Sequence, residues 1–432
     1  MRKIFQYILM AVAVVVTASC SNELDEALQP ANNGTLQFVV SDFPMFGEGI
    51  QTRVIGTQDE GKTAWENGDQ IIVTLISQKY GEQAVALIYN GSSWSTEASL
   101  SYLENETPSV SVFYAPCYEV TEEGVMQLRS GMQLGMTEYL SGNYEIENGI
   151  MTITFEGAIR DYSRLRIATM PEATLTVTTT DFTPAGATEV ATAAYTLTTD
   201  NNGNAFLYGV FAEDATVSVK QGDVILKDYT FTVDKNPGVS AHNKSYALDA
   251  TPVIDGTLGG KATAEESDIT ALVEQLKAYV DNGITTIIVP GSKPATIDMG
   301  LWINTAIGEA IYRLSKEESY DGKIDLILPD VTEIVDQEFD GAHALNSINL
   351  PKVTTVGDGA FYDCQYLEEL TFGSVVTAIN HNTRAEFHRV GEKVEGCDLV
   401  LNREQVNAEA DYQPNIETRT WWNTEWKSIT LK

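Results

Sequence analysis

The stretch that decides the fold of the C-terminal part is IDLILPDVTEIVDQEFDGAHALNSINLPKVTTVGDGAFYDCQYLEELTF, from Ile324 to Phe372. Apolar residues recur in it every 22 positions, in columns that keep one register. These columns are Leu326 with Ile348 and Leu370, Leu328 with Leu350 and Phe372, Val331 with Val353 and Val375, Phe339 with Phe361, and Leu345 with Leu367. Such a period predicts a repeat solenoid in which each unit contributes one short parallel strand.

One repeat also resembles a known family. The unit GDGAFYDCQYLEELTF from Gly357 is similar to the treponeme-type (BspA-like) leucine-rich repeat of bacterial surface proteins, whose units read AF…C…L. The resemblance implies that Cys364 occupies a buried ladder position.

The regular repeats, about 324–379, are too few to stand alone, so flanking segments are expected to cap them. Upstream, Ile287, Val289 and Pro290 repeat the strand signature. Downstream, Leu399 and Leu401 predict another strand, and the aromatic end TWWNTEW with Ile429 and Leu431 is expected to cover the last open edge.

Residues 251–432 are expected to form this repeat domain, and its N-terminal part is predicted to be helical. One helix follows from apolar residues at helical spacing, with Ser267 or Asp268 as N-cap and Gly283 as the stop. Its apolar residues are Ile269, Leu272, Val273, Leu276 and Val280. A second helical stretch carries Trp302, Ile303, Ile307, Ile311 and Leu314.

From Leu36 to about Ala250, short runs of alternating apolar residues are separated by Gly, Asn, Asp and Pro. The runs include LQFVV, QIIVTLI, SVSVFYA, MTITF, LTVTT, ATVSVK and YTFTV. Alternation at period two predicts antiparallel sheets packed as sandwiches. The length of the segment predicts two of them, at 35–160 and 161–250, after an N-terminal segment that ends at Gly34.

Several motifs in that segment resemble the fimbrillin family of fimbrial subunits and lipoproteins. They are TR at Thr52 and Arg53, TAWENGDQIIV from Thr63, YNGSSW ending at Trp94, VSVFYAP ending at Pro116, FEGAIRDYSRLRI from Phe155 and KSYALD from Lys244. The resemblance implies two transthyretin-like sandwiches. Trp65 and Trp94 are then expected to anchor the core, and Gly68 with Asp69 to form the tight turn before the next strand. The expected fold class is therefore multidomain, a mainly β tandem β-sandwich followed by a short α/β leucine-rich-repeat solenoid with flanking helices.

The N-terminus resembles a bacterial lipoprotein signal peptide over residues 1–19. A basic start, an apolar run from Tyr7 to Val16 and the small residues before Cys20 make up this pattern, although Thr17 stands where leucine is usual. The resemblance implies lipidation of Cys20 and attachment of the mature chain to a membrane through that lipid. The alternative is an ordinary secretory signal with an incidental cysteine.

Residues 20–34 read as a polar tether after the lipidated cysteine. The acidic residues Glu23, Asp25 and Glu26 resemble the surface-export signal of lipoproteins in gut and oral Gram-negative anaerobes. The expected location is therefore the outer membrane, facing the cell exterior. The simpler interpretation is a solvated linker.

Composition limits the partners of the chain. With 61 acidic and 27 basic residues, the formal net charge is −34, which repels nucleic acid phosphates and anionic headgroups. Apart from Cys20, three cysteines remain, with no CxxC spacing, which argues against a disulfide framework and a zinc site. Cys117, Cys364 and Cys397 are therefore expected to be buried small side chains.

Three sequence patterns resemble functional motifs but lack a feature that the function needs. GTQDEGKT, from Gly56 to Thr63, matches the P-loop pattern but runs into a strand instead of a helix. DQEFDG, from Asp336, imitates the start of an EF-hand but has Ser347 where the twelfth position needs glutamate. The four histidines, His242, His343, His381 and His388, have no catalytic or metal-ligand pattern around them. The sequence therefore predicts no catalytic residue, cofactor or metal site.

The sequence favours a non-catalytic surface lipoprotein that binds a host protein or glycan for adhesion. An alternative is a fimbria-associated accessory or tip subunit assembled by strand exchange, in which Arg53 would be a cleavage site. A third hypothesis, a surface glycan-processing enzyme, has only the predicted location in its favour. The sequence does not name the ligand or the binding face.

Overall fold

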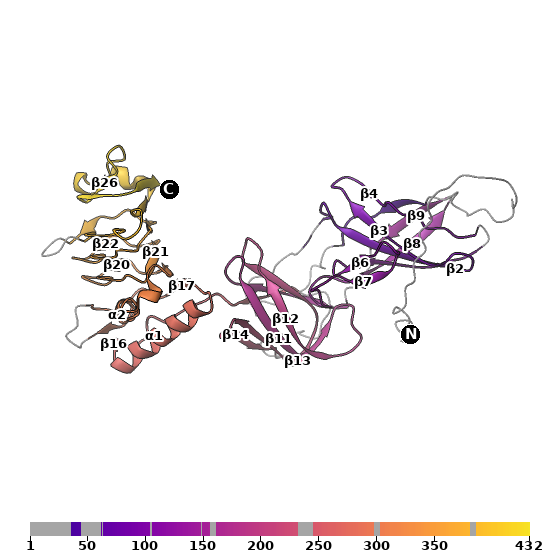
Figure 1. The fold of residues 1–432 in the computed structure, drawn as a ribbon, viewed down its shortest axis with the longest axis horizontal. Coiled ribbons are helices and arrows are strands. Elements are labelled where there is room, and N and C mark those ends of the chain that lie inside the picture. Colours follow the sequence, from indigo (N-terminus) through magenta and orange to yellow (C-terminus); the bar gives the residue numbers. More distant parts are fainter. Residues whose placement is uncertain are drawn as a thin grey trace. The chain divides into compact units, whose positions relative to one another are not determined.

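The computed structural model describes residues 36–44, 62, 64–103, 106–147, 149–155, 161–231, 245–297, 303–380 and 386–432. These residues form mainly β-strands, with two α-helices (Figure 1). The chain divides into two compact units. The first comprises Met1–Val219 and Lys227–Ala250, and the second comprises Lys220–Leu226 and Thr251–Lys432. Cys20, the predicted signal peptide and the predicted tether lie outside the described residues, among which no helix is long and apolar enough to cross a membrane.

The first unit begins with a seven-stranded sheet. Its strands in spatial order are β1 (Gln37–Val40), β9 (Ile150–Thr154), β8 (Leu140–Glu147), β5 (Ser109–Tyr114), β2 (Gln70–Ser77), β3 (Gly81–Tyr89) and β4 (Trp94–Ser95). In the central strand β2, Ile71, Val73 and Leu75 are fully buried in one apolar cluster. Residues two apart point to the same side of a strand, so the alternating pattern places all three in the core.

A second sheet follows in the same unit, apart from Lys220–Leu226. Its strands in spatial order are β12 (Ala191–Thr198), β11 (Thr174–Pro184), β13 (Asn204–Gln221), β10 (Ser163–Ala168) and β15 (Ser245–Asp249), and β14 (Val224–Thr230) also pairs with β13. The rings of Phe182, Phe211 and Phe231 are completely buried. Phe211 stacks on Phe231 with 4.6 Å between ring centroids, so aromatic packing dominates this core.

The expectation of purely antiparallel sheets is wrong at two strand pairs. β1 runs parallel to β9, with Gln37 opposite Ile150, and β10 runs parallel to β15, with Arg164 opposite Ser245. Each pair joins strands far apart in the sequence, and a parallel pair needs such a long connection. Alternation at period two is the same in both kinds of strand, so the sequence pattern could not distinguish them.

Trp65 and Trp94 belong to the edge of the first core, not its centre. Both side chains are half-buried and pack against the apolar cluster, and their rings meet nearly at right angles with 4.9 Å between centroids. The Trp65 indole N–H donates to the Ser41 carbonyl at 2.8 Å. Gly68, with φ of +93°, forms the turn that leads into β2, as predicted.

Two helices open the second unit. Helix α1 (Glu266–Asp281) buries Ile269, Leu272 and Leu276. Its N-cap is Glu265, so the expectation of Ser267 or Asp268 is wrong. Asp268 instead lies in the first turn, where its carboxylate accepts the Glu265 backbone N–H at 2.9 Å.

Helix α2 (Ala306–Leu314) starts later than its apolar pattern suggested. Thr305 is the N-cap, and its hydroxyl accepts the Gly308 N–H at 3.2 Å. Ile303 therefore precedes the helix, and Trp302 lies outside the described residues. The N-cap decides the boundary because its side chain satisfies a backbone donor that the helix itself cannot.

The repeats form a six-stranded sheet in which every neighbouring pair is parallel. We call it the repeat sheet, and its strands in order are β17 (Thr286–Ile288), β19 (Ile324–Ile327), β21 (Leu345–Leu350), β23 (Glu369–Phe372), β25 (Asp398–Leu401) and β28 (Ser428–Leu431). Leu326 lies opposite Ile348, which lies opposite Leu370. The predicted columns are thus confirmed for these strands, and so are the additional strands on both sides.

A three-stranded sheet runs beside the repeat sheet along the same repeats. Its strands are β20 (Glu333–Ile334), β22 (Thr355–Val356) and β24 (Ala378–Ile379), all parallel. Ile334 pairs with Val356 at the predicted period, but Val356 pairs with Ile379, one position beyond it. Val376 is accordingly the buried valine of the third repeat, and the expectation that Val375 fills this column is wrong. One extra residue after Phe372 shifts the register.

Short elements complete the described part of the chain. They are β6 (Tyr118–Val120), β7 (Met126–Leu128), β16 (Thr263–Ala264), β18 (Thr296–Ile297), β26 (Thr420–Trp421), β27 (Thr424–Glu425) and the 3₁₀ segments η2 (Glu318–Tyr320), η3 (Arg403–Asn407) and η4 (Ala410–Tyr412). Trp421 and Trp426 are buried in the same apolar cluster as Phe387 and Leu399. The aromatic C-terminal segment therefore packs against the end of the repeats, and β28 covers the edge of β25, as predicted.

Candidate binding surface of the repeat region

The turn after each buried phenylalanine has a left-handed backbone residue at the same place. Gly341, Asp363 and Arg389 occupy equivalent positions two residues after Phe339, Phe361 and Phe387, with φ of +69°, +61° and +61°. Glycine adopts this conformation freely and aspartate tolerates it, but arginine does so rarely. Two of the three turns thus place a charged side chain where the backbone alone would favour glycine.

These turns are joined by hydrogen bonds between repeats. The Gly341 N–H donates to the Tyr362 carbonyl, and the Asp363 N–H donates to the His388 carbonyl, each at 2.8 Å. The backbone of each turn is therefore fixed by the next repeat. Side chains carried by the turns are held at a constant spacing along the stack.

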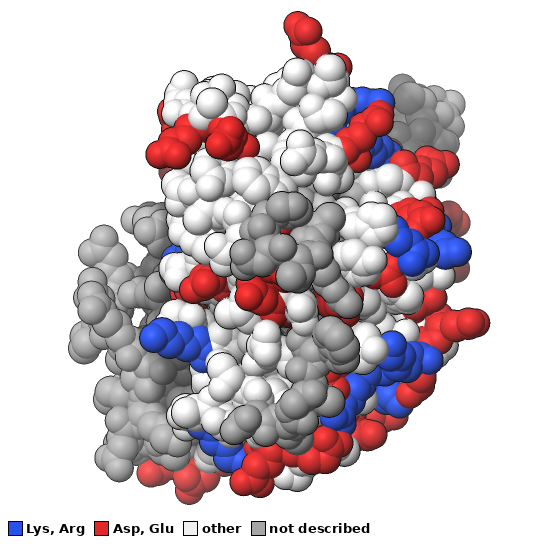
Figure 2. Space-filling view, turned by 90° about the vertical axis from the view of Figure 1, so that its left-hand side faces the viewer, with Lys and Arg blue, Asp and Glu red and all other residues white. Residues whose placement is uncertain are grey.

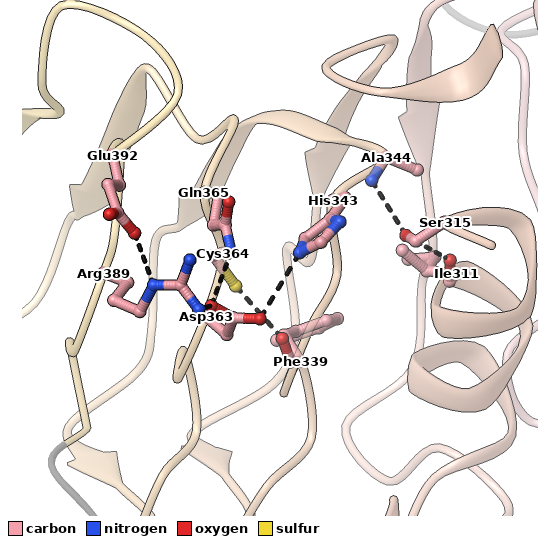
Figure 3. A network of polar contacts seen from close by, with 10 residues as sticks. All are labelled: Ile311, Ser315, Phe339, His343, Ala344, Asp363, Cys364, Gln365, Arg389 and Glu392. Atoms are coloured by element: carbon pink, nitrogen blue, oxygen red, sulfur yellow. Dashed lines mark hydrogen bonds and ion pairs between the residues drawn. The ribbon is translucent and has the colours of Figure 1, made fainter. Parts of the chain in front are cut away.

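The side chains on three successive turns form a connected polar array, which we call the lateral network (Figure 3). Asp363 lies at its centre. Its Oδ1 lies 2.8 Å from an Arg389 guanidinium nitrogen and accepts a 2.8 Å hydrogen bond from Gln365 Nε2, and its Oδ2 lies 3.5 Å from His343 Nε2. Arg389 also pairs with Glu392. One carboxylate thus links residues from three repeats.

The lateral network is open to solvent but ordered. The exposed fraction of the side chain is 28% for His343, 23% for Asp363 and 40% for Arg389. The hydrogen bond to Glu392 raises the pKa of Arg389, so its positive charge is fixed at any physiological pH. Exposed ion pairs stabilise a fold by only about 0–1 kcal/mol each, so their main effect here is to orient the charges.

Aromatic rings flank this network. Tyr362 lies against His388 with 5.1 Å between ring centroids, and Tyr366 lies 5.7 Å from His343. The Tyr366 hydroxyl is hydrogen bonded to Asp321, which raises the pKa of the phenol. Tyrosine and arginine are the residues that most often anchor protein interfaces, because they combine large contact area with hydrogen-bonding ends.

The outward side of the repeat sheet carries a different array. Asp325, Ser347, Glu369, Asp398 and Ser428 face one another along one row of it. Ser347 donates to Asp325 at 2.7 Å, and Ser428 donates to Asp398 at 2.6 Å. The carboxylates of this row are partly satisfied by neighbouring hydroxyls, so the row is acidic, and it carries no basic side chain among these five residues.

The wider surface is acidic as well. On the face shown in Figure 2, Asp and Glu side chains are spread widely, and Lys and Arg side chains lie mainly along one border. The Lys and Arg side chains along this border have Asp and Glu side chains beside them.

The structure places few of the other residues that sequence analysis singled out for chemistry. Most of the P-loop-like segment lies outside the described residues, but Lys62 is held by Asp69 at 2.5 Å just before strand β2. His242 and His381 are also outside them. Within the described ranges, no group of three His, Cys, Asp or Glu residues is arranged to hold a metal ion.

The EF-hand-like segment is folded into the repeats. Glu338 is buried and accepts hydrogen bonds from the Val335 N–H at 3.0 Å and the Thr305 hydroxyl at 3.1 Å. Burial raises its pKa to about 7, which opposes the charged form that calcium would need. Glu338 is therefore a structural residue.

The cysteines Cys117, Cys364 and Cys397 are free and buried, as expected. The Cys364 thiol donates to the Phe339 carbonyl at 3.0 Å, and burial raises its pKa well above the usual range. Burial likewise raises the pKa of Cys397. A thiol with a raised pKa is a poor nucleophile, so these side chains serve packing.

Sequence analysis did not predict the lateral network. The signal was nevertheless present, since Gly341 and Asp363, and also His343 and Gln365, stand one full period apart in the same register as the apolar columns. Arg389 could not be aligned in this way, because the separation between Asp363 and Arg389 in the sequence is longer than the 22-residue period.

Comparison with known families supports the repeat assignment. Residues 323–389 match the family model described as BspA type Leucine rich repeat region (6 copies). This part of the chain is therefore similar to leucine-rich repeats of the type that the AF…C…L pattern indicated. Comparison with curated protein sequences gives no match.

Among solved structures, the chain is similar to a candidate cell adhesion protein of Bacteroides fragilis. The identity is 12%, over 50% of this chain and 92% of that chain, with a TM-score of 0.24. A TM-score this low does not establish a shared fold. The fimbrillin resemblance of residues 35–250 stays a prediction.

Proposed function

We propose that the chain is a cell-surface lipoprotein that acts as a non-catalytic adhesion or ligand-binding module for a host protein or glycan. In this proposal, fimbrillin-like sandwiches carry a short leucine-rich-repeat solenoid, and a lipid on Cys20 attaches the chain to the outer membrane. The N-terminal sequence pattern supports the lipid anchor. The match to the repeat family supports the leucine-rich-repeat region.

The observation that carries the proposal is the lateral network. Asp363 pairs with Arg389 of the next repeat at 2.8 Å and lies 3.5 Å from His343 of the preceding repeat, and tyrosines lie beside them. Such an array costs little conformational entropy on binding because its side chains are already ordered. Raised thiol pKa values at Cys364 and Cys397 argue against a nucleophile in the same region.

The test is an array of host proteins and glycans probed with the soluble chain that lacks residues 1–20. Asp363→Gly removes the central carboxylate while keeping a residue suited to φ of +61°. It should abolish or weaken binding at least tenfold without lowering the unfolding temperature by more than about 5 °C. Asp330→Ala is the matched control, since it removes another aspartate paired with a surface lysine, Lys352. An array without any hit, or equal binding by both variants, would contradict the proposal.

The lipid anchor has its own test. Cys20→Ala, expressed in a Gram-negative host with lipoprotein processing, should lose metabolic labelling by a fatty acid and leave the membrane fraction. Unchanged labelling would show that another residue carries the lipid or that the labelling is unspecific.

A second candidate function is a fimbria-associated subunit assembled by strand exchange, and one observation favours it. Strand β1 precedes Arg53 and lies at the edge of its sheet, parallel to β9, while Leu36 and Phe43 on either side of it are buried. Cleavage after Arg53 would separate β1 from the sheet and allow a strand of another subunit to replace it. Treatment with an arginine-specific protease, followed by electron microscopy, should then yield polymers that Arg53→Ala prevents.

A further inference from the structure

A cavity of about 500 Å³ lies at the C-terminal end of the second unit, separate from the lateral network. The hairpin of β26 and β27 and the segment after η4 surround it. Its lining residues are Asp411, Gln413, Asn415, Thr420, Trp421, Trp422 and Asn423. Amide and carboxylate groups thus lie near the partly exposed indole of Trp422.

The backbone that carries one of these indoles is strained. Trp422 and Asn423 form the two-residue turn between β26 and β27, with φ of +48° and +57°. Turns of this kind favour Asn and Gly, and a large aromatic residue is rarely found in them. The protein keeps tryptophan at a position where glycine would fold more easily, and strain of this kind concentrates at functional sites.

Two contacts hold the strained indole in place. Trp422 stacks on Tyr412 with 5.3 Å between ring centroids and an angle of 4°, and its N–H donates to Glu386 at 3.1 Å. The Tyr412 carbonyl accepts hydrogen bonds from Gln405 and from the Trp421 indole, each at 2.9 Å. Both indole N–H groups are used inside the protein, and Trp421 is buried in the core, so Trp422 is the residue that offers apolar ring surface to the cavity.

The polar groups of the cavity are available. Within the described residues, the Asp411 carboxylate and the Asn423 side-chain amide make no hydrogen bond to the protein. Asn415 Oδ1 accepts the Thr418 N–H at 3.0 Å, which leaves its NH₂ group as a donor, and Gln413 donates to Ala408 at 2.7 Å, which leaves its carbonyl oxygen. The cavity thus offers both donors and acceptors beside an aromatic surface.

This combination fits a sugar ring better than other small ligands. A pyranose has a face of polarised C–H groups that packs on an aromatic ring, and hydroxyls around its edge that both donate and accept. A carboxylate such as Asp411 accepts hydroxyl hydrogen bonds strongly but repels an anionic sugar. The net charge of −34 acts in the same direction, so the ligand should be uncharged.

We propose that this cavity is a binding subsite for a neutral saccharide unit, with Trp422 as the stacking surface and Asp411 and Asn423 as hydroxyl partners. The inference rests on the proposed adhesion function and narrows the ligand of one surface to a neutral glycan. It assigns to the C-terminal hairpin a role beyond closing the end of the repeats.

The test is calorimetric titration of the chain that lacks residues 1–20 with cellohexaose, maltohexaose, mannohexaose and N-acetylchitohexaose, each up to about 10 mM, and with 3′-sialyllactose as the anionic probe. At least one neutral oligosaccharide should bind. Trp422→Gly should weaken that binding at least tenfold while relieving the strained turn, so that its unfolding temperature stays within about 5 °C of the parent. Asp411→Asn should weaken it as well.

Arg419→Gly is the matched control. Arg419 lies in the same hairpin region with φ of +52° but does not line the cavity, so this variant should bind as the parent does. Equal binding by the parent and Trp422→Gly, binding of sialyllactose alone, or no binding of any neutral oligosaccharide would overturn the assignment. The array experiment with Asp363→Gly is independent of these outcomes, because array hits that persist in Trp422→Gly leave the adhesion proposal intact.

Discussion

The rings of Phe361 and Phe387 lie parallel, with 5.8 Å between their centroids and 8° between their planes, although more than one period of the sequence separates them. Phe339 and Phe361, which stand exactly one period apart in the chain, have the same 5.8 Å spacing. The spacing of the phenylalanine rings in this column therefore stays constant although the number of residues between them changes. The column, not the length of each repeat, sets the spacing of the turns that carry the lateral network.

Phe361→Ala should lower the free energy of unfolding by about 3–5 kcal/mol, because the ring is fully buried between two other phenylalanines. Lys352→Ala, at an exposed ion pair with Asp330, should cost less than about 1 kcal/mol. Chemical denaturation of both variants measures the difference. Similar small effects for the two would mean that the phenylalanine column does not hold the repeats together.

Gly357→Ala should also be destabilising, by about 1–3 kcal/mol. The repeat pattern alone places Gly357 in a connecting arm where a methyl group would be tolerated. In the structure, a Cβ atom there would lie 2.4 Å from the Asp336 backbone nitrogen and 2.5 Å from the Val335 carbonyl carbon. Backbone atoms of the preceding repeat cannot move aside as a side chain can. Denaturation of this variant beside Lys352→Ala decides the point, and equal midpoints would refute it.

Glu338 should make stability depend on pH. Its pKa is raised by burial from 4.5 to about 7, so the folded chain binds this proton more tightly than the unfolded chain does. The contribution of this group to the free energy of unfolding is therefore fully present below pH 4.5. It is lost as the pH rises through 7, and the total loss is about 3 kcal/mol. Glu338→Gln cannot ionise. The stability of this variant relative to the parent should rise by that order between pH 4.5 and pH 8, and a constant difference would contradict the assignment.

The segment Thr251–Glu265 should belong to the second unit in solution. Its sequence, TPVIDGTLGGKATAE, has the composition of a linker. In the structure, however, Val253 forms a parallel bridge to Ile288, and Ile254 is fully buried with its N–H bonded to the Ile288 carbonyl at 2.9 Å. A fragment of residues 251–432 should therefore unfold at a higher temperature than a fragment of residues 265–432. Identical thermal transitions would show that these contacts contribute nothing.

The sequence by itself determined the local and periodic features of this chain. The periodic columns at Leu326, Ile348 and Leu370 predicted parallel strands, because identical spacing of buried side chains leaves one register in which all of them face the core. The buried state of Cys364 followed from the resemblance to the treponeme-type repeat. Alternating runs such as QIIVTLI predicted strands, since a period of two matches the pleat.

Only the tertiary structure decided how these pieces pair and what they present to solvent. Parallel pairing of β1 with β9 depends on where long connections return, which period-two alternation does not encode. The lateral network depends on packing that brings Arg389 beside Asp363, although more than one repeat period separates them in the sequence. The aromatic cavity depends on a turn that places Trp422 against Tyr412. These sites are made of residues from different repeats and loops, so their chemistry arises from packing across the chain and not from any local pattern.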